Sequence, residues 1–345
     1  MKLKSLLLAS GAAVVAVSGA RAADAVIIPE PEPVEYVRVC DAAGTGYFYI
    51  PGTETCLQIS GEVIYYLRFH DDEYFTNEIS GTQPGWIKEY EISLDFNTWR
   101  DTEFGALTTS IQLGAGEDSA DFTGDVLLDG TVFVNEAFIT LGGLTIGYTD
   151  SFYPGGLGAS DLDAEGPDTG LIGYTVDFGS GSFGIALEDD GSADWMPAIA
   201  AVGSAEFGDF TVAAAAVYDD TDDFFGAQLH LAYASGPLSA NASVQYSEPG
   251  AFGFSTGSAY SAAYEWVLGA AIGYEVTDQL TLALGVDYGI DQFGTAGDDD
   301  ILVEVAADYE LVDGFTIGFQ ADFSDRRSSG DFGWEDAEIT FTRSF

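Results

Sequence analysis

The chain has 345 residues, and its 57 Asp and Glu against 10 Lys and Arg give a formal net charge of −47 at pH 7. Hydrophobic residues make up 47% of the chain and aromatic residues 14%, which is too apolar for an acidic disordered tail. The charge excludes a nucleic-acid partner, because the basic stripe that neutralises phosphates is missing. Beyond residue 20 no apolar run is long enough for a transmembrane helix, and the 43 interleaved glycines favour short strands with tight turns.

The first residues predict a secretory signal peptide over residues 1–22. Lys2 and Lys4 form a basic start, residues 6–17 form an apolar run, and residues 20–22 match the small-x-small cleavage pattern. An uncleaved anchor helix is the alternative, but the run is short and no basic stop-transfer flank follows it. We therefore expect an exported protein whose mature chain begins directly after this segment.

The next segment, residues 23–59, is expected to precede the strands on the periplasmic side. Residues 29–33 alternate Pro and Glu, which predicts an extended spacer. Cys40 and Cys56 are the only cysteines, and in an oxidising compartment they favour one disulfide that closes a short loop. A metal site would need further soft or imidazole ligands nearby, and none lies within that loop.

From residue 60 onward, apolar side chains recur at every second position, which is the period of a β-strand. Sixteen such segments begin near residues 60, 87, 103, 132, 143, 171, 182, 197, 209, 224, 238, 260, 280, 300, 314 and 334. Short turns such as 142–143 alternate with long loops such as 151–170. A soluble sandwich shows the same alternation, so the strand count and the connections decide. They predict an all-β fold over residues 60–345: a transmembrane up-and-down antiparallel barrel of 16 strands, with short periplasmic turns and longer external loops.

The two faces of these segments differ as a membrane barrel requires. Tyr and Trp concentrate near strand ends on the apolar face, where amphipathic rings meet the lipid headgroups. These positions are Tyr148, Tyr218, Tyr233, Tyr246, Trp266, Tyr274, Tyr288 and Tyr309. The opposite face is polar, and in a closed barrel of this size it turns to a water-filled lumen. The residues that we expect to line this lumen include Glu62, Arg68, Glu91, Asp95 and Glu136.

Two stretches resemble alphaproteobacterial (rhizobial/Brucella-type) outer-membrane porins. The first is VEYVRVCD at residues 34–41, continued by GYFYIPGTETCL at residues 46–57, and it resembles the start of the mature proteins of that family. The second, residues 137–152, resembles the strand pair that leads into the third loop of the family. The N-terminal match is long and specific, whereas the body of the chain matches mainly in pattern.

The resemblance implies a homotrimer in the outer membrane of a Gram-negative bacterium, surrounded by membrane lipid and lipopolysaccharide. It implies passive diffusion of small hydrophilic solutes and ions through the barrel, and no cofactor or metal is expected. The third external loop, about residues 150–170, would fold into the pore and bring acids to its constriction: Asp150, Asp161, Asp163, Glu165 and Asp168. The terminal Phe345 ends an amphipathic strand and resembles the signal read by the barrel assembly machinery.

The barrel wall departs from the family pattern. Porin constrictions usually oppose the loop acids with a cluster of Arg and Lys on the wall. Here Arg68 is the base that the alternation turns inward, and no basic residue occurs between Arg100 and Arg326. Acidic rings attract cations at close quarters, so we predict a cation-selective pore. An acidic surface that reflects a saline habitat is the alternative explanation.

The motifs that could indicate an enzyme lack the surroundings that each one needs. Residues 179–184 match the dinucleotide-binding pattern literally, but they join two expected strands and no helix follows. His70 and His230 are the only histidines and lie far apart in the sequence, which argues against a histidine-dependent triad or a zinc site. Two other functions stay open: a solute-selective outer-membrane channel, and a soluble exported all-β adhesin or binding protein.

Overall fold

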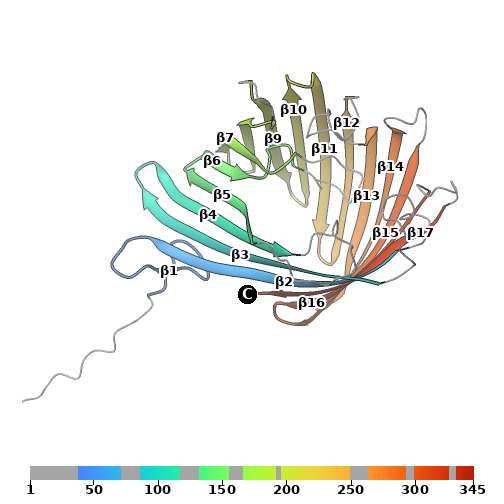
Figure 1. Cartoon of the computed structure of the whole chain (residues 1–345), viewed down its shortest axis with the longest axis horizontal. Helices are drawn as coiled ribbons and strands as arrows, with labels where there is room; N and C mark the ends of the chain where they lie inside the picture. The colour runs from blue at the N-terminus through green and yellow to red at the C-terminus, as the bar shows by residue number, and fades with distance from the viewer. Residues whose placement is uncertain are drawn as a thin grey trace, which may run out of the picture. The chain divides into compact units, whose positions relative to one another are not determined.

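The structure is a computed structural model that describes residues 38–70, 86–116, 132–154, 166–191, 196–248, 263–292, 299–325 and 332–345 (Figure 1). The expected signal peptide and Pro-Glu spacer lie outside the described residues. Within the described ranges, no helix is long and apolar enough to cross a membrane.

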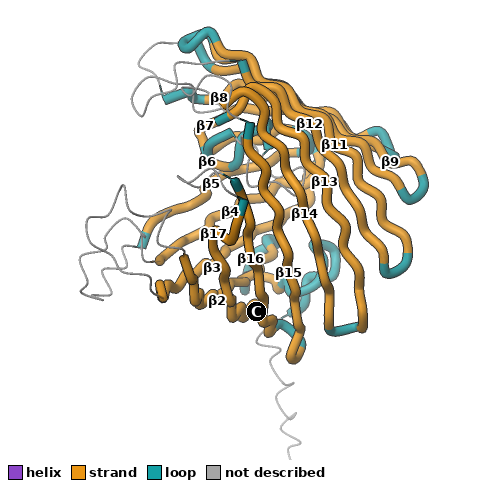
Figure 2. The backbone as a smooth tube through the Cα atoms, turned by 90° about the vertical axis from the view of Figure 1, so that its right-hand side faces the viewer, coloured by secondary structure: helices purple, strands orange, loops and turns teal. Residues whose placement is uncertain are grey.

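Seventeen strands of the described ranges join in one sheet, and all of them except β1 form a closed antiparallel barrel (Figures 1 and 2). Each wall strand pairs with its neighbours in the sequence, and β17 pairs with β2 to close the ring. The wall strands are β2 (Cys56–His70), β3 (Trp86–Thr102), β4 (Gly105–Gly116), β5 (Phe133–Leu141), β6 (Leu144–Thr149), β7 (Thr169–Asp177), β8 (Gly181–Glu188), β9 (Ala198–Phe207), β10 (Phe210–Asp219), β11 (Phe224–Ser235), β12 (Leu238–Ser247), β13 (Tyr264–Thr277), β14 (Leu280–Gln292), β15 (Asp300–Val312), β16 (Phe315–Ser324) and β17 (Gly333–Ser344).

The sixteen wall strands are the sixteen segments predicted from the sequence. One end of the barrel, here the short-turn rim, carries the tight turns such as 142–143 and 208–209, and the other end is the long-loop rim. At the long-loop rim the connections differ in length, and β10 and β11 are joined by residues 220–223 alone. Asp219 Oδ1 accepts a hydrogen bond from Thr221 N at 3.0 Å, and this side-chain turn lets the chain reverse direction within a few residues.

Strand β8 shows how the wall obtains its two faces. Ile185 and Leu187 are 47% and 49% exposed on the outside, whereas Ala186 and Glu188 are 2% and 0% exposed. Successive side chains of a strand point to opposite faces, so each strand presents an apolar stripe outward. The exposed apolar stripe continues around the barrel at Ile139, Ile172, Leu229, Leu268 and Leu284. An apolar belt of this extent suits contact with lipid.

Aromatic side chains form a belt at each rim of the outer face. At the long-loop rim, the Tyr246 ring centroid lies 4.9 Å from that of Trp266 and 6.4 Å from that of Phe225. At the short-turn rim, the ring centroids of Phe210 and Tyr233 are 4.9 Å apart. These two belts mark the levels of the two membrane–water interfaces.

The two ends of the wall meet at a seam between β17 and β2. Their pairing runs as far as Ser344 opposite Glu62. Beyond it, Phe345 N donates to Gly61 O at 3.0 Å and Gly61 N donates to Phe345 O at 3.1 Å. A Cβ at Gly61 would approach the Phe345 ring to 2.9 Å, so only a glycine leaves room for the ring there. The terminal residue therefore completes the closure of the barrel.

A disulfide-closed hairpin covers an open edge of β2 at the short-turn rim. β2 continues past the end of β17, and there β1 (Phe48–Tyr49) pairs with its first residues. The disulfide between Cys40 and Cys56, predicted from the sequence, ties this hairpin to β2. An open strand edge is a template for unwanted pairing, so the hairpin protects the barrel. The sequence pattern does not reveal β1, because two residues show no alternation.

Removing this disulfide is expected to release the hairpin and leave the barrel folded. Closing a loop with a sequence separation of 16 contributes about 3 kcal/mol in the chain-entropy model. In a Cys40→Ser/Cys56→Ser variant, limited proteolysis within residues 41–55 should become at least roughly tenfold faster. The barrel should still migrate as a folded species in unheated gels. Cleavage at the rate of the oxidised protein would mean that β1 pairing alone holds the hairpin.

Candidate functional site

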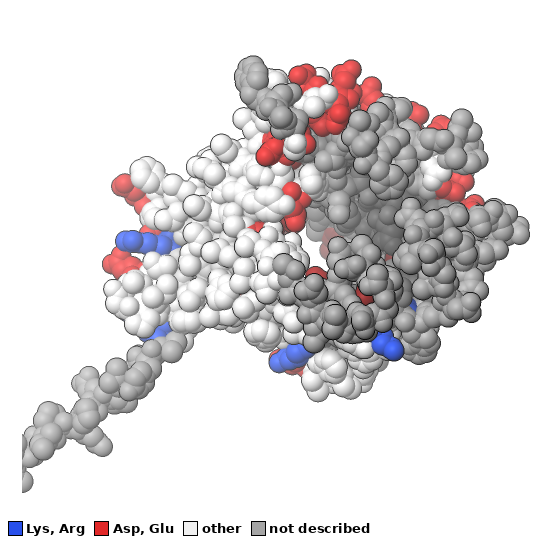
Figure 3. Space-filling view, in the orientation of Figure 1, with Lys and Arg blue, Asp and Glu red and all other residues white. Residues whose placement is uncertain are grey.

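The inner face of the barrel is dominated by acids. In Figure 3, described Asp and Glu side chains gather around the hollow in the middle of the view. Among the described strand residues that face inward, Arg68 is the one Lys or Arg. The carboxylates on this face include Glu62, Glu89, Glu91, Asp95, Glu136, Glu188, Asp287, Glu304, Asp308, Asp322, Asp336 and Glu338.

Arg68 is held between two of these acids. Its Nη1 lies 2.9 Å from Glu89 Oε2 on β3, and its Nε donates to Glu338 Oε2 on β17. The guanidinium carbon lies 4.8 Å from the centroid of the Tyr66 ring, which adds a cation–π contact. Glu89 is 7% exposed, and a carboxylate this buried needs a paired cation. The positive charge of Arg68 is therefore already compensated within the wall.

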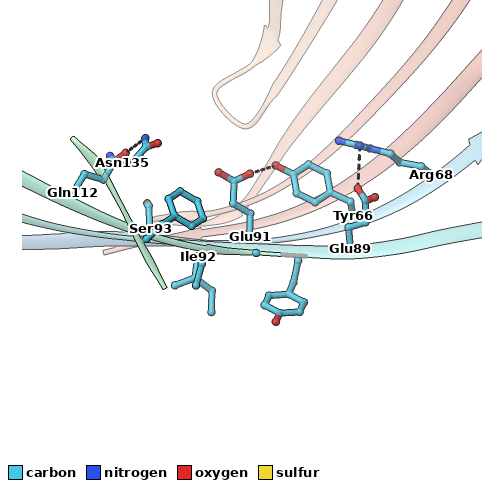
Figure 4. Close-up of a pocket in the computed structure, with 13 residues that line it drawn as sticks. Tyr66, Arg68, Glu89, Glu91, Ile92, Ser93, Gln112 and Asn135 are labelled. Carbon is cyan, nitrogen blue, oxygen red and sulfur yellow. Dashed lines mark hydrogen bonds and ion pairs between the residues drawn. The ribbon is translucent and has the colours of Figure 1, made fainter. Parts of the chain in front are cut away.

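A second polar network lies next to Arg68 on β2 to β5. Tyr66 OH donates to Glu91 Oε2 at 3.0 Å. Gln112 Nε2 donates to Asp95 Oδ1 at 2.8 Å, and Asn135 Nδ2 donates to Gln112 Oε1 at 2.5 Å. Figure 4 shows Tyr66, Glu91, Gln112 and Asn135 on the lumen side of the wall and Ile92 on the other side.

The chain that leaves β6 turns into the barrel interior and is anchored by Glu188 on β8. Ser151 Oγ donates to Glu188 Oε2, and Phe152 N donates to Glu188 Oε1, both at 2.6 Å. Glu188 is 0% exposed, so both carboxylate oxygens are used within the protein. Hydrogen bonds to an ionised group are the stronger kind, and here they fix the direction of the chain after β6.

Two glutamines extend this anchoring across the wall. Gln245 Nε2 on β12 donates to Tyr153 OH at 3.1 Å, and Gln228 Nε2 on β11 donates to Pro154 O at 2.5 Å. Tyr153 is completely buried. Residues 151–154, here the loop stem, are thus attached to β8, β11 and β12.

Small residues on the inner face make room for the loop stem. Phe152 lies against Gly173 and Gly184, where a Cβ would approach the ring to 2.6 Å and 2.8 Å. Tyr153 packs in a cluster with Ala198, Ala200, Ala215, Val217 and Phe224. The Gly and Ala residues that face inward on β7 to β10 therefore have a steric reason: larger side chains would displace the stem.

The structure brings some of the predicted loop acids near the wall acids. Asp150 precedes the loop stem, and its backbone N–H donates to Glu136, which also accepts from Thr149 Oγ1 at 3.2 Å. Asp168 is half-buried directly before β7. The other three predicted loop acids, Asp161, Asp163 and Glu165, lie outside the described residues.

Among the acids that the structure describes at the long-loop rim, none belongs to a metal-binding arrangement. The described residues form no group of three or more His, Cys, Asp or Glu side chains that could hold an ion. At the turn after β10, burial and the nearby charges of Asp219 and Asp190 raise the pKa of Asp222.

The contacts between the loop stem and the wall involve residues that the sequence did not single out. The alternation places Glu188 on the polar face, but Gln228, Gln245 and Tyr153 carry no motif. Inward-facing Gly and Ala positions on consecutive strands were the available signal, because an inner wall of small residues implies that something else fills the space.

A closed barrel with an apolar outside, aromatic belts and a polar inside is the architecture of an outer-membrane barrel protein. A model of the porin subfamily matches residues 24–342. Porin Omp2a of Brucella ovis is 46% identical over 213 residues, which cover 55% of this chain and 60% of that protein. Porin Omp2b of Brucella suis is 46% identical over 207 residues, covering 56% of this chain and 54% of that protein. The matched region thus spans little more than half the length of these relatives.

Solved structures show the same fold at low sequence identity. The outer-membrane channel DcaP of Acinetobacter baumannii has a TM-score of 0.64 at 13% identity, covering 86% of this chain and 99% of that one. OmpF of Salmonella typhi, in a complex with daunomycin, has a TM-score of 0.58 at 13% identity, covering 85% of this chain and 98% of that one.

The chain belongs to the porin subfamily. Its location is the outer membrane of a Gram-negative bacterium. This membership confirms the predicted family and fold and the prediction that the protein is no enzyme, and it sets aside the soluble adhesin.

Proposed function

We propose that this protein forms a water-filled channel for passive diffusion of small hydrophilic solutes and ions, and that it favours cations. The observation that carries the proposal is the charge of the inner wall. Its one described base, Arg68, is paired with Glu89 and Glu338, while Glu91 and Asp95 face the lumen without a basic partner among the described residues. Carboxylates that line a pore lower the energy of a passing cation.

The loop stem supports a second part of the proposal. In this view the third loop, about residues 150–170, narrows the lumen and carries the acids Asp150, Asp161, Asp163, Glu165 and Asp168. Anchoring of the stem by Glu188 directs the loop inward. The wall residues Glu62, Arg68, Glu91, Asp95 and Glu136 line the remaining passage.

The proposal extends to biogenesis and assembly. The signal peptide over residues 1–22 is removed, and the family match begins at residue 24. Residues 23–59 stay on the periplasmic side, and the barrel assembly machinery reads Phe345 at the end of β17. The mature chain forms a homotrimer surrounded by membrane lipid and lipopolysaccharide. OmpT of Vibrio cholerae, which has a TM-score of 0.57 and 13% identity, is described in a trimer form.

The proposal is tested by planar-bilayer recordings across a KCl gradient. We expect stepwise conductance and a reversal potential directed by K⁺. The preference should weaken between 0.1 M and 1 M salt, because the screening length falls from about 10 Å to about 3 Å. A conducting but unselective or anion-selective pore would refute cation preference and support the habitat explanation of the acidity. Absence of conductance from correctly folded protein would refute the channel.

A further inference from the structure

A recess opens in the inner wall beside Arg68, between β2 and β5 (Figure 4). Its volume is about 410 Å³, within the range of sites that hold small molecules. Its polar lining comes from Tyr66, Arg68, Glu89, Glu91, Ser93, Gln112 and Asn135. Phe133 adds an aromatic surface, and its ring lies over Gly114, where a Cβ would approach it to 2.6 Å. This combination of one apolar surface and several converging polar groups is typical of a binding site.

The hydrogen bonds within the recess leave one carboxylate oxygen available. Tyr66 OH donates to Glu91 Oε2 and so fixes the orientation of the carboxylate. Glu91 Oε1 accepts no hydrogen bond from the described residues, and the Glu91 side chain is exposed to the recess. An ionised carboxylate can only accept, so a solute at this oxygen must bring a donor.

The charge of the recess favours a cationic donor. Arg68 is compensated by Glu89 and Glu338, so it does not neutralise Glu91. The amide of Gln112, which donates to Asp95, is neutral and brings no positive charge to this part of the wall. An anionic group would meet uncompensated carboxylates, whereas an ammonium group would form a charge-assisted hydrogen bond with Glu91.

We propose that this recess binds small polyhydroxylated amines through their ammonium group, with Glu91 as the residue that determines this preference. The hydroxyl groups of the solute meet Ser93 and the amide of Asn135, and its carbon skeleton lies against Phe133. The inference rests on the proposed channel function and names a solute class for it. The channel remains passive, and the recess makes the flux of such amines saturable.

The test compares three six-carbon chains that differ in charge: N-methylglucamine as the cation, sorbitol as the neutral analogue and gluconate as the anion. Each is added to the intact protein in a planar bilayer at constant KCl, and the concentration that halves the K⁺ current is measured. N-methylglucamine should block at a lower concentration than sorbitol and gluconate. Glu91 is exposed, so loss of its ion pair with the ammonium group in Glu91→Gln should raise the half-blocking concentration by about three- to fivefold.

Asp308→Asn is the matched control, because it removes one lumen-facing negative charge from β15, which β16 and β17 separate from the recess. It should leave the block by N-methylglucamine within roughly twofold of the wild type. If both variants raise the half-blocking concentration of N-methylglucamine equally, the inference is overturned, because the overall negative charge of the lumen then explains the block. Equal block by all three solutes in a cation-selective pore would also overturn it and leave the proposed function intact. Absence of conductance in the wild type would instead refute the proposed function.

Discussion

Glu188→Ala is expected to raise the single-channel conductance and its noise. The variant removes both acceptors that hold the loop stem, namely the partners of Ser151 Oγ and Phe152 N. Hydrogen bonds to a charged group contribute about 1.5–3 kcal/mol each. A loss of about 3 kcal/mol raises the ratio of detached to attached stems roughly 100-fold. If the stem directs the third loop into the lumen, a detached stem widens the passage, and planar-bilayer recordings at single-channel resolution measure the change.

Two further variants separate the anchor from a general defect. Glu188→Gln preserves the side-chain volume and one acceptor oxygen, so its conductance should lie between those of the wild type and Glu188→Ala. Gly173→Val leaves Glu188 intact but places a Cβ 2.6 Å from the Phe152 ring, and it should change conductance in the same direction as Glu188→Ala. A folded Glu188→Ala protein with wild-type conductance would show that the stem does not limit the passage.

The wall of the barrel could be predicted because its information is local. Each strand repeats every two residues, so the inward direction of Arg68, Glu91 and Glu188 follows from a few neighbours in the sequence. Tight turns and long loops then give the direction of each strand. The structure has all sixteen wall strands where the alternation placed them. Only β1 was not predicted, and it is held beside β2 by the disulfide between Cys40 and Cys56.

The loop stem could not be predicted, because its partners lie far away in the sequence. Phe152 meets Glu188 36 residues later, and Tyr153 meets Gln245 92 residues later. A repeat of two residues along one strand does not predict contacts between such distant residues. Glu188 is also one of 57 acidic residues, so its residue type alone gives no reason to select it.

The compensation of Arg68 is a long-range property as well. Glu338 lies 270 residues away and reaches Arg68 only because β17 closes the barrel against β2. The sequence predicts a lone base in the lumen, whereas the structure shows a base between two acids. This changes the electrostatic interpretation: the wall beside the third loop has no free positive charge among its described residues, which strengthens the case for cation preference.

Arg68→Met is expected to destabilise the barrel and to increase its preference for cations. Removal of one partner of a buried ion pair costs about 3–5 kcal/mol, because the other charge stays buried alone. The Arg68 side chain is 37% exposed, which reduces the expected loss in the free energy of unfolding to about 2–3 kcal/mol. Glu89 carries most of this cost, since its side chain is 9% exposed. The midpoint of urea unfolding in detergent micelles measures the loss, and the reversal potential measures the selectivity.

Two further variants test whether the effect comes from the ion pairs of Arg68 on β2 with Glu89 on β3 and Glu338 on β17. Arg100→Met removes the exposed pair with Glu54, whose side chain is 83% exposed, and should change the stability by about 1 kcal/mol or less. Arg68→Met/Glu89→Gln neutralises the carboxylate left behind and should recover part of the lost stability. If the double variant is no more stable than Arg68→Met, the guanidinium stabilises the seam through its packing on Tyr66 rather than by neutralising Glu89. The cation preference should rise in Arg68→Met under either outcome, because one positive charge has left the lumen.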